Sequence, residues 1–575
     1  MSEAFVSLAL KKTEGAELKL LDSRRLTGLN LVSPGPGAVT EVSFEDGEDP
    51  STAVQAWSDA VDRCLDRLSW SARSRWVRMQ ESSASLVLDA ELDALYAATE
   101  INEWAVADAS GRAPELTEFL AQLDTALEEE RCPGMLSLQA EASRRQLPFV
   151  WDDDAVSVGM GRRSRMWTRA ELPSPASVPW DEVGEIPVVY ITGTNGKTTS
   201  TRMTARILQA AGHRPGFTSS DGVVVDGALI EKGDWTGPGA ARCVLRHPDV
   251  DIAVLETARG GLLRRGLVVD QCDGALITNI ASDHLGEYGV HSVEDMARVK
   301  GLVCRSVRPA GRRVLNADDP LLWKLGMEAG PQVTWFSLGP LRAELREHLD
   351  RGGDLWMLDD GWLCELRGQE RERVVDAAKI PATYDGTAIH NVANALGAAA
   401  LSRALGVSTD DIRRGLESFG GTAVDNPGRC QLETYRGIRV LLDFGHNPHG
   451  VRAMLSMARR LMGDRTDSRL WVSLGQAGDR SDTDLKDLAV AVWEARPHRI
   501  SLREVAGYER GRDSGEVVGI MRDALVMSGH PAAQIDHHPD ESSAMTEALE
   551  WAREGDLVVH LVHMQRDAVR SILDA

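Results

Sequence analysis

Paired cysteines, long apolar runs and an excess of positive charge are all missing from this sequence of 575 residues. Its seven cysteines stand singly, without a CxxC or a zinc-like spacing, so we expect free thiols in a reducing cytoplasm. No stretch approaches the roughly 18 uninterrupted apolar residues of a transmembrane helix. The N-terminus has no basic region and no small-residue cleavage site of the signal-peptide type. These absences predict a cytoplasmic protein that neither crosses nor binds a membrane.

Acidic residues outnumber basic ones by 87 to 64, which gives a net charge of −23 at pH 7. A strong negative field disfavours nonspecific contact with nucleic acids, so no nucleic-acid partner is expected either. A local basic pocket for phosphates remains compatible with this charge. The hydrophobic fraction of 43% and the charged fraction of 26% are ordinary for globular domains, which excludes a disordered, collagen-like or coiled-coil chain.

The first part of the chain predicts an α+β N-terminal domain over residues 1–170. It combines an early strand-like stretch with helical segments such as 51–68 and 115–129. Residues 171–187 hold four prolines, which fix backbone angles and remove amide donors. This stretch therefore predicts a linker or an extended crossing between domains.

Short apolar strands alternate with helices from residue 188 on, a pattern that predicts a mostly parallel sheet with ligands at the carboxyl ends of its strands. The first set of expected strands is 188–192, 252–256, 275–279 and 313–316, with a helix over 198–211. Residues 353–374 interrupt the alternation and predict a hairpin. The second set of expected strands is 439–444, 470–474, 499–502 and 557–562. We therefore expect an α/β fold with a P-loop central domain over 188–425 and a Rossmann-like C-terminal α/β domain over 426–575.

The strongest chemical signal is VVYITGTNGKTTSTRMTARIL, in which a strand, a glycine loop and a helix follow one another. Glycines let backbone amides approach phosphates, and the N-terminus of the helix adds the positive end of its dipole. Lys197 can reach the terminal phosphates, and the hydroxyl of Thr198 or Thr199 can ligate magnesium. Ile191 stands where the full GxxxxGK pattern has its first glycine, so the loop is a variant. The residues predicted to bind the nucleotide phosphates are Gly193, Thr194, Asn195, Gly196, Lys197, Thr198 and Thr199.

Three further residues of the central region carry chemistry that suits this loop. Glu256 ends the apolar strand VDIAVLE, where a parallel sheet can place a carboxylate for magnesium beside the phosphates. His284 follows another strand in ALITNIASDHLGEYG, and Lys300 stands on an expected helix. Each of these residues alone is equally compatible with a solvated strand end, a packed histidine or a surface lysine.

Polar residues gather again in the second alternating region. Asn391 and Asn394 stand three apart on one helical face, a spacing suited to the polar edge of a base. Arg429 ends the motif NPGR, and Asp443 and His446 follow a strand in LLDFGHNPHG. Each one alone could be a cap or a turn residue, but their number at loop and helix starts favours a ligand site.

Taken together and in this order, GTNGKTT, NIASDHLG, ARVKGLV, LNADDP, HNVANALGAAA, NPGR and DFGHNPHG resemble the Mur ligase family. Within it, ETARGGLLRRGL and TSSDGVVVDG are similar to the Mur-like part of cyanophycin synthetases. RRLTGLN and AEASRRQLPFVWDDDAVSVGMGRR are similar to the N-terminal domain of those enzymes. In cyanophycin synthetases an ATP-grasp domain lies between these parts, whereas here only the proline-rich stretch separates them. We therefore expect that this chain alone cannot carry out their two-step addition of aspartate and then arginine.

The resemblance implies an ATP-dependent ligase that activates a carboxylate as an acyl phosphate and joins it to an amine, releasing ADP and phosphate. The catalytic residues that it implies are Lys197, Glu256, His284 and Lys300, the last as a carbamylated lysine. Magnesium would be held by Thr198, Glu256 and His284. The residues implied around the nucleotide are Asn391, Asn394, Arg429, Asp443 and His446.

The expected substrates are a carboxylate-bearing peptide or peptide-like acceptor and an amino acid. Segments 474–484 and 503–516 follow C-terminal strands, and their mixed charges would suit an amino acid such as arginine, although solvated loops explain them equally well. A homo-oligomer is compatible with the resemblance. One alternative is a nucleotide-gated binding protein without ligase activity, which has no need of the catalytic set just named. Another is a folylpolyglutamate-type ligase, against which the cyanophycin-synthetase-like N-terminal region argues.

Overall fold

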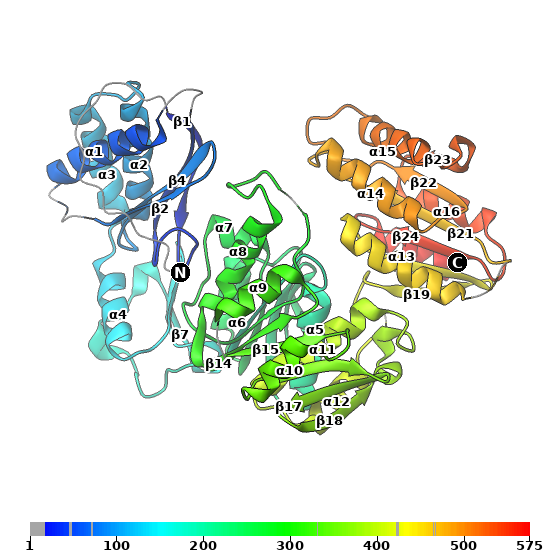
Figure 1. Ribbon diagram of the computed structural model, residues 1–575. Coiled ribbons are helices and arrows are strands. Elements are labelled where there is room, and N and C mark those ends of the chain that lie inside the picture. The colour runs from blue at the N-terminus through cyan, green and yellow to red at the C-terminus, as the bar shows by residue number, and fades with distance from the viewer. Residues whose placement is uncertain are drawn as a thin grey trace. The chain divides into compact units, whose positions relative to one another are not determined.

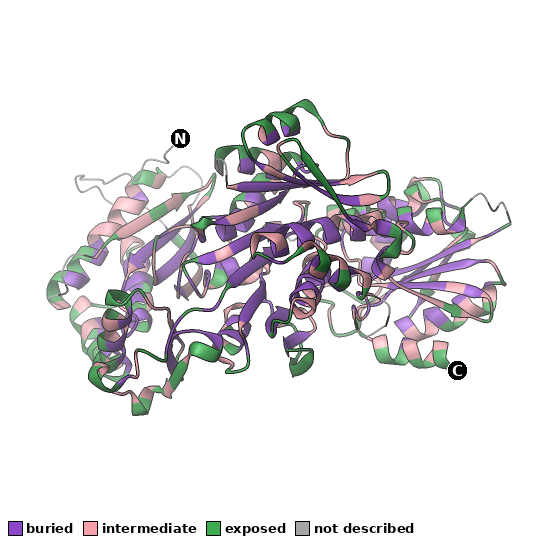
Figure 2. Ribbon diagram, turned by 90° about the horizontal axis from the view of Figure 1, so that it is seen from below, coloured by how far each residue is buried: buried purple, intermediate pink, exposed green. Residues whose placement is uncertain are grey.

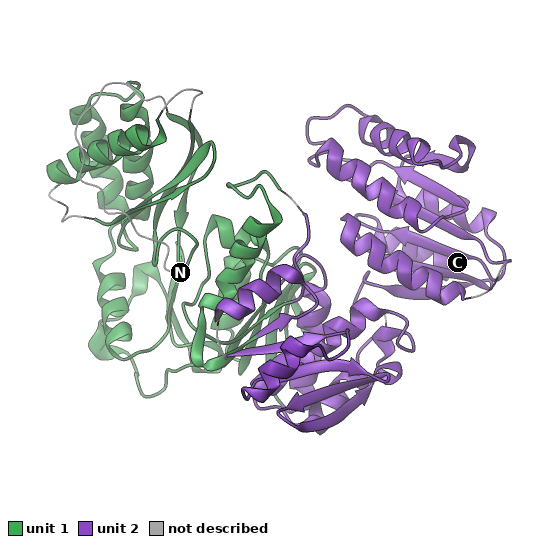
Figure 3. Ribbon diagram, in the orientation of Figure 1, with its two compact units in different colours: residues 1–192, 213–277, 285–313 green, residues 193–212, 278–284, 314–575 purple. Residues whose placement is uncertain are grey.

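The computed structural model describes residues 18–44, 49–68, 70, 73–283, 285–329, 332–420, 422, 425–463, 465 and 467–575, and Figure 1 shows their helices and strands. The chain forms two compact units, each assembled from three segments (Figure 3). Unit 1 comprises residues 1–192, 213–277 and 285–313, and unit 2 comprises residues 193–212, 278–284 and 314–575. The chain therefore crosses from one unit to the other directly after the first strand of the predicted P-loop.

Unit 1 begins with an antiparallel sheet packed against helices. The four strands, in the order β1-β2-β4-β3, are β1 (Leu18–Leu26), β2 (Gly37–Phe44), β4 (Ser83–Asp89) and β3 (Arg75–Met79). The helices are α1 (Pro50–Leu68), α2 (Leu95–Ala109), α3 (Leu116–Glu130) and α4 (Pro133–Arg144). Trp57 of α1 is buried and donates to Asn102 of α2 at 2.6 Å, and Asn102 in turn donates to the carbonyls of Ala38 and Leu86 in the sheet. The expected α+β N-terminal region, with its helices near 51–68 and 115–129, is confirmed.

The proline-rich stretch packs against its own unit. It follows a small antiparallel sheet of β5 (Phe149–Trp151), β6 (Ala155–Val158) and β7 (Arg165–Thr168) and the short 3-10 turn 169–171, and it contains a second such turn at 175–177. Val178, Val183 and Ile186 are buried. Trp180 donates its indole N–H to the carbonyl of Pro175 at 2.7 Å. Residues 175–186 are thus a packed crossing that leads directly into the next strand.

The remaining strands of unit 1 form the sheet that leads to the predicted P-loop. Their order is β11 (Ala228–Lys232), β10 (Gly222–Val225), β9 (Pro215–Ser219), β12 (Ile252–Glu256), β8 (Val188–Thr192) and β13 (Cys272–Ile277). Strand β8 pairs in parallel with β12 and with β13, and all residues of β8 and β12 are buried. The helices are α6 (Pro238–Arg246), α7 (Arg259–Arg264) and α8 (Val293–Arg305). The expected strands 188–192 and 252–256 are confirmed with their bounds, because a strand buried on both faces is a continuous apolar run.

Unit 2 begins with the helix that follows the loop, α5 (Lys197–Ala210), against which α11 (Ile389–Ala404) and α12 (Thr409–Glu417) pack. Strand β14 (Val307–Asn316) starts in unit 1 and ends in unit 2, followed by α9 (Pro320–Ala329), β15 (Val333–Ser337) and α10 (Ala343–Asp350). The hairpin expected over 353–374 is present as β16 (Asp354–Asp359) and β17 (Trp362–Arg367), but the prediction missed a third strand. Strand β18 (Glu370–Asp376) pairs with β17 and extends the hairpin to a three-stranded meander. The first four residues of β18 are exposed and charged, so they lack an apolar strand pattern.

The C-terminal part of unit 2 is a doubly wound α/β domain, as expected from the sequence. Its sheet has the order β19 (Gln431–Tyr435), β20 (Ile438–Asp443), β24 (Leu557–Leu561), β21 (Leu470–Gly475), β22 (Arg499–Arg503) and β23 (Ile535–His538). All neighbours pair in parallel except β19, an antiparallel edge strand. Helices α13 (Pro448–Met462), α14 (Asp482–Glu494) and α15 (Glu516–Met527) share one core cluster, and α16 (Glu541–Trp551) and α17 (Arg566–Asp574) share a second. The central strands β24 and β21 are fully buried, whereas the edge strand β19 is not, and Figure 2 shows exposed residues on the helices that cover the sheet.

None of the described helices is long and apolar enough to cross a membrane. The seven cysteines are free thiols, as expected, and five of them are buried.

Candidate functional site

The loop between β8 and α5 requires glycine at two positions. Gly193 has φ +147° and Gly196 has φ +83°, backbone conformations that favour glycine. A Cβ atom on Gly193 would lie 1.9 Å from Oγ1 of Thr278, and one on Gly196 would lie 2.2 Å from Oδ1 of Asn394. Conformation and space therefore give two independent reasons for glycine at each position.

The segment after β13 fixes the backbone of this loop. The amide of Asn195 donates to Oδ1 of Asn279 at 2.9 Å, and Nδ2 of Asn279 donates to the Asn195 carbonyl at 3.0 Å. The Thr278 hydroxyl donates to the same carbonyl at 2.6 Å. The amide of Thr194 donates to the Asn279 carbonyl at 2.9 Å. The loop is thus held in shape by protein groups alone, which is what a pre-organised phosphate site needs.

Lys197 and two threonines start the helix that follows. The ammonium of Lys197 donates to the carbonyl of Thr194 at 2.9 Å, so the cation lies back across the loop. Thr198 and Thr199 are buried, and the hydroxyl of Thr199 accepts from Nδ2 of Asn426 at 3.1 Å. A lysine cation and the positive end of a helix dipole thus meet at one glycine loop, an arrangement that attracts phosphate.

Glu256 lies at the matching end of the sheet in unit 1. It is the buried last residue of β12 and stands in register with Ile191 of β8. The amide of Thr257 donates to the Ile191 carbonyl at 2.8 Å, and the Thr192 hydroxyl donates to the Thr257 carbonyl at 2.6 Å. Because Gly193 follows Thr192 in the chain, this carboxylate stands at the strand end from which the glycine loop leaves.

Of the other two catalytic candidates, only Lys300 is among the described residues. Lys300 is buried on α8. His284 lies outside the described residues. Among the residues that are described, no group of three or more His, Cys, Asp or Glu side chains is arranged to hold a metal ion.

The two asparagines of α11 form a chain of amide contacts toward the loop. Oδ1 of Asn394 accepts from the Ser200 hydroxyl of α5 at 3.4 Å. Nδ2 of Asn394 donates to Asn391 at 3.1 Å, and Asn391 donates to the carbonyl of Ala382 at 2.7 Å. Asn394 therefore stands beside the loop at Gly196, whereas Asn391 stands one step behind it.

Arg429, Asp443 and His446 gather around the end of β20. The guanidinium carbon of Arg429 lies 4.3 Å from the ring centre of Phe444, a cation–π distance. Asp443 accepts from the amides of Cys430 and Gly445, both at 2.7 Å. Burial raises the pKa of Asp443, and Arg429 together with these amides opposes the rise. Nε2 of His446 lies 3.6 Å from Oδ2 of Asp283.

One contact that joins the loop to the C-terminal domain was missed by sequence reasoning. Asn195 and Asn447 exchange two amide hydrogen bonds of 3.1 and 2.9 Å, and Nδ2 of Asn195 lies 2.9 Å from Nδ1 of His449. Oδ1 of Asn447 also caps α13, accepting from the Gly450 amide at 2.9 Å. An Asn-Pro at a helix start does signal this cap. The partner of the cap, however, is 252 residues away and leaves no local pattern.

Hydrogen bonds join segments 474–484 and 503–516, the two segments expected to meet the incoming amine. Arg512 donates to the carbonyl of Gly478 at 3.0 Å and to that of Arg480 at 2.8 Å. Arg480 itself donates to Oδ1 of Asp283 at 3.0 Å. Segment 474–484 thus reaches the residue next to His284, and sequence reasoning did not identify Asp283 or Arg480 as partners.

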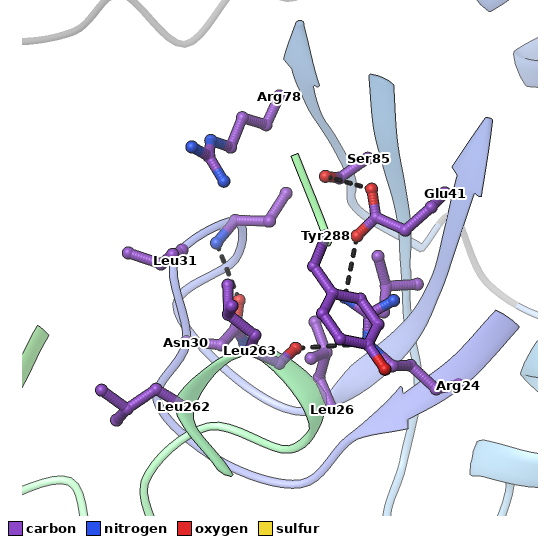
Figure 4. A pocket seen from close by; sticks show the side chains of 12 residues that line it. Arg24, Leu26, Asn30, Leu31, Glu41, Arg78, Ser85, Leu262, Leu263 and Tyr288 are labelled. Carbon is purple, nitrogen blue, oxygen red and sulfur yellow. Dashed lines mark hydrogen bonds and ion pairs between the residues drawn. The ribbon is translucent and has the colours of Figure 1, made fainter. Parts of the chain in front are cut away.

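A small pocket within unit 1 lies where the N-terminal sheet meets α7 (Figure 4). Arg24 donates to Glu41 at 2.8 Å and to the carbonyl of Leu263 at 3.2 Å. Its guanidinium carbon lies 4.7 Å from the ring centre of Tyr288. The charge of Arg24 is thus already paired. Its contacts join the segment after Glu256 to the N-terminal sheet.

A glycine loop with a lysine and a helix start at the end of a parallel sheet, followed by a doubly wound domain, defines a P-loop α/β protein of nucleotide-binding type. Comparison with known families narrows this class. The Mur ligase middle domain matches residues 191–402, and the Mur ligase glutamate ligase domain matches residues 428–561. The chain belongs to the Mur ligase family.

Individual relatives share the same region. Cyanophycin synthetase of Crocosphaera subtropica is 38% identical over 384 residues, which are 66% of this chain and 43% of that protein. UDP-N-acetylmuramate–L-alanine ligase of Clavibacter michiganensis is 29% identical over 380 residues, 65% of this chain and 69% of that protein. The solved structure of MurF from Acinetobacter baumannii aligns with a TM-score of 0.47 and 20% identity, over 68% of this chain and 76% of that chain. The chain thus spans less than half the length of the cyanophycin synthetase that it matches.

Proposed function

We propose that this chain is an ATP-dependent amide ligase that activates a carboxylate as an acyl phosphate and joins it to the amine of an amino acid. The observation that carries the proposal is the glycine loop with Lys197 across it, at a strand end whose neighbour ends in the buried Glu256. Membership of the Mur ligase family supports it.

The proposed reaction has two steps. A carboxylate oxygen of the acceptor attacks the γ-phosphorus of ATP, and ADP leaves with the electron pair of the broken P–O bond. The amine nitrogen then attacks the acyl carbon, phosphate leaves, and the nitrogen loses a proton. The loop amides and Lys197 would neutralise negative charge on the phosphoryl group while it is transferred. Such charge stabilisation is the main source of catalysis in phosphoryl transfer.

Magnesium is the metal that this chemistry implies, and the residues suit it. Thr198 offers a hydroxyl and Glu256 a carboxylate, both buried, and Mg²⁺ prefers oxygen ligands. We propose that Thr198 and Glu256 hold it, with His284 and a carbamylated Lys300 near the acyl phosphate. When bound, the ion would neutralise charge on the phosphate oxygens.

The helix α11 and the C-terminal domain would supply the rest of the nucleotide site, and the C-terminal domain would bring in the amino acid. We propose that the nucleotide lies against Asn391, Asn394, Arg429, Asp443 and His446. The contact of Asn195 with Asn447 would hold this domain on the loop and keep water from the acyl phosphate. One relative is named as a ligase of L-alanine. By analogy we propose a peptide-like carboxylate acceptor and an amino acid, and the mixed charges of segments 474–484 and 503–516 would suit one such as arginine. Residues 1–170, 188–425 and 426–575 would be the three functional parts, with residues 171–187 linking the first to the second.

Phosphate release from Mg·ATP tests the proposal. Amino acids are offered singly beside aspartate-containing peptides, and mass spectrometry searches for new amides, with Lys197→Ala as the blank. We expect one pair to stimulate release and to give a product that has lost one water. ATP binding without stimulated release from any pair would favour a nucleotide-gated binding protein instead.

A further inference from the structure

Five arginines meet in unit 1 where the segment after β1 packs against α6 and α7, and they are not neutralised equally. Arg24 pairs with Glu41, Arg25 pairs with both carboxylate oxygens of Asp153, and Arg246 pairs with Asp152. Among the residues that the structure describes, the remaining two donate only to neutral oxygens. These are Arg242 on α6 and Arg265 at the end of α7.

Both arginines contact the segment 25–27. Nη2 of Arg242 donates to the Thr27 hydroxyl at 3.4 Å, a long and weak contact. The amide of Thr27 donates to the backbone carbonyl of Arg265 at 2.9 Å. Nη1 of Arg265 donates to the carbonyl of Arg25 at 2.9 Å. Both guanidinium groups therefore contact residues 25–27 through neutral oxygens, while Asp152 and Asp153, whose charges act on them, are paired with Arg246 and Arg25.

The surroundings disfavour the charged form of both arginines. Nε of Arg242 is buried and has no hydrogen-bond partner among the described residues. Burial lowers the pKa of Arg242, and the charges of Arg246 and Arg265 act in the same direction, against Asp152 and Asp153. Burial and the charge of Arg25 likewise lower the pKa of Arg265. A half-buried cation whose neighbouring carboxylates are already paired with other arginines gains stability from binding an anion.

One member of the pair lies close in the chain to the proposed chemistry. Arg265 follows Glu256 by nine residues, and α7 lies between them. Guanidinium groups are the preferred partners of carboxylates and phosphates because their planar forks match both oxygens. We propose that Arg242 and Arg265 form an oxyanion subsite that binds a second carboxylate of the acceptor and so selects acidic, peptide-like acceptors. This inference rests on the proposed ligase function for the identity of the ligand, but not for the existence of the subsite.

Thermal unfolding of the full chain tests the subsite without any ligase activity. The probes are succinate and inorganic phosphate, each compared with KCl at equal ionic strength. The variants are Arg242→Gln and Arg265→Gln, with Arg264→Gln as the matched control, because Arg264 is exposed and contacts Tyr288 instead. We expect succinate to raise the Tm of the wild type and of Arg264→Gln, and the shift to be lost in the other two variants. The Tm of Arg242→Gln without added anion should not fall, because the substitution removes a half-buried cation that makes no hydrogen bond to a carboxylate among the described residues.

Equal succinate shifts in all four proteins, or no shift in any of them, would overturn the proposal. A shift with phosphate but not with succinate would overturn the assignment to a carboxylate. Once an amide-forming pair is known, both variants should raise the KM of the acceptor by about tenfold or more while the KM of ATP stays unchanged. If succinate shifts the Tm selectively but no pair forms an amide, the proposed function is contradicted and the subsite is supported.

Discussion

Position 196 requires glycine both for its backbone conformation and for the close approach of Asn394, and experiment can separate these two requirements. Gly212 has nearly the same backbone conformation, φ +86°, but open space around its missing Cβ. Gly212→Ala should therefore cost only the left-handed backbone strain, about 1 kcal/mol in the free energy of unfolding. Gly196→Ala should cost more, because Asn394 must move, and should weaken ATP binding by about tenfold or more. Urea unfolding and titration with a fluorescent ATP analogue measure both. Equal effects of the two substitutions would mean that close approach of Asn394 does not matter.

A second residue-scale prediction concerns His560, which is fully buried in β24. Neither ring nitrogen has a hydrogen-bond partner among the described residues, and burial holds the pKa of His560 well below its usual value. The unfolded chain takes up a proton as pH falls below about 6.5, whereas the folded chain does not, so acidification favours unfolding. His560→Leu should remove this share of the acid sensitivity, about 1.4 kcal/mol between pH 7.5 and 5.5. Urea unfolding of both proteins at the two pH values checks this. Parallel losses of stability would show that His560 is protonated in the fold.

At the scale of elements, helix α13 depends on Asn447 in two separable ways. The side chain caps the helix and also pairs with Asn195. Asn447→Ala should lose about 1 kcal/mol of unfolding free energy with the cap, whereas Asn447→Ser keeps a capping oxygen and should lose little. Both variants lose the amide pair, so both should release more phosphate per amide formed, because water reaches the acyl phosphate. Denaturation curves and the ratio of phosphate to amide separate the two roles. A normal ratio in Asn447→Ser would assign the residue to capping alone.

The elements also show what local sequence can and cannot predict. Strands β8 and β12 were predicted with their bounds because burial on both faces leaves an uninterrupted apolar signature, and the loop was predicted because few sequences need glycine, lysine and threonine at that spacing. Strand β18 was missed because its exposed half is charged. The pairs of Asn195 with Asn447 and of Asp283 with Arg480 join residues 252 and 197 positions apart. Such pairs depend on how elements pack, which no local period encodes.

At the scale of the whole molecule, unit 1 depends on a close backbone approach between its N-terminal sheet and the segment after Glu256. A Cβ on Gly28 would lie 2.0 Å from the carbonyl of Leu267, and the Leu267 amide donates to the Leu29 carbonyl at 2.8 Å. Gly28→Ala should therefore loosen this junction and speed hydrogen exchange at the Leu267 amide, while exchange in the C-terminal sheet of unit 2 stays unchanged. Gly35→Ala is the control, because nothing lies near its missing Cβ. Exchange mass spectrometry reads both regions in one experiment. Unchanged exchange near Leu267 in Gly28→Ala would contradict this view of the junction.

The chain passes back and forth between the two units, which has a consequence for recombination between related genes. Because each unit is assembled from three chain segments, no single crossover between two related genes can exchange one unit whole. A crossover near residue 314 would transplant the contiguous 314–575 block of unit 2 but leave behind its segments 193–212 and 278–284. Asn447 would then meet a foreign residue at position 195, and Arg480 a foreign residue at position 283. Chimaeras of this kind should survive only when both parents carry compatible residues at these positions, so the pairs should act as a barrier to gene shuffling.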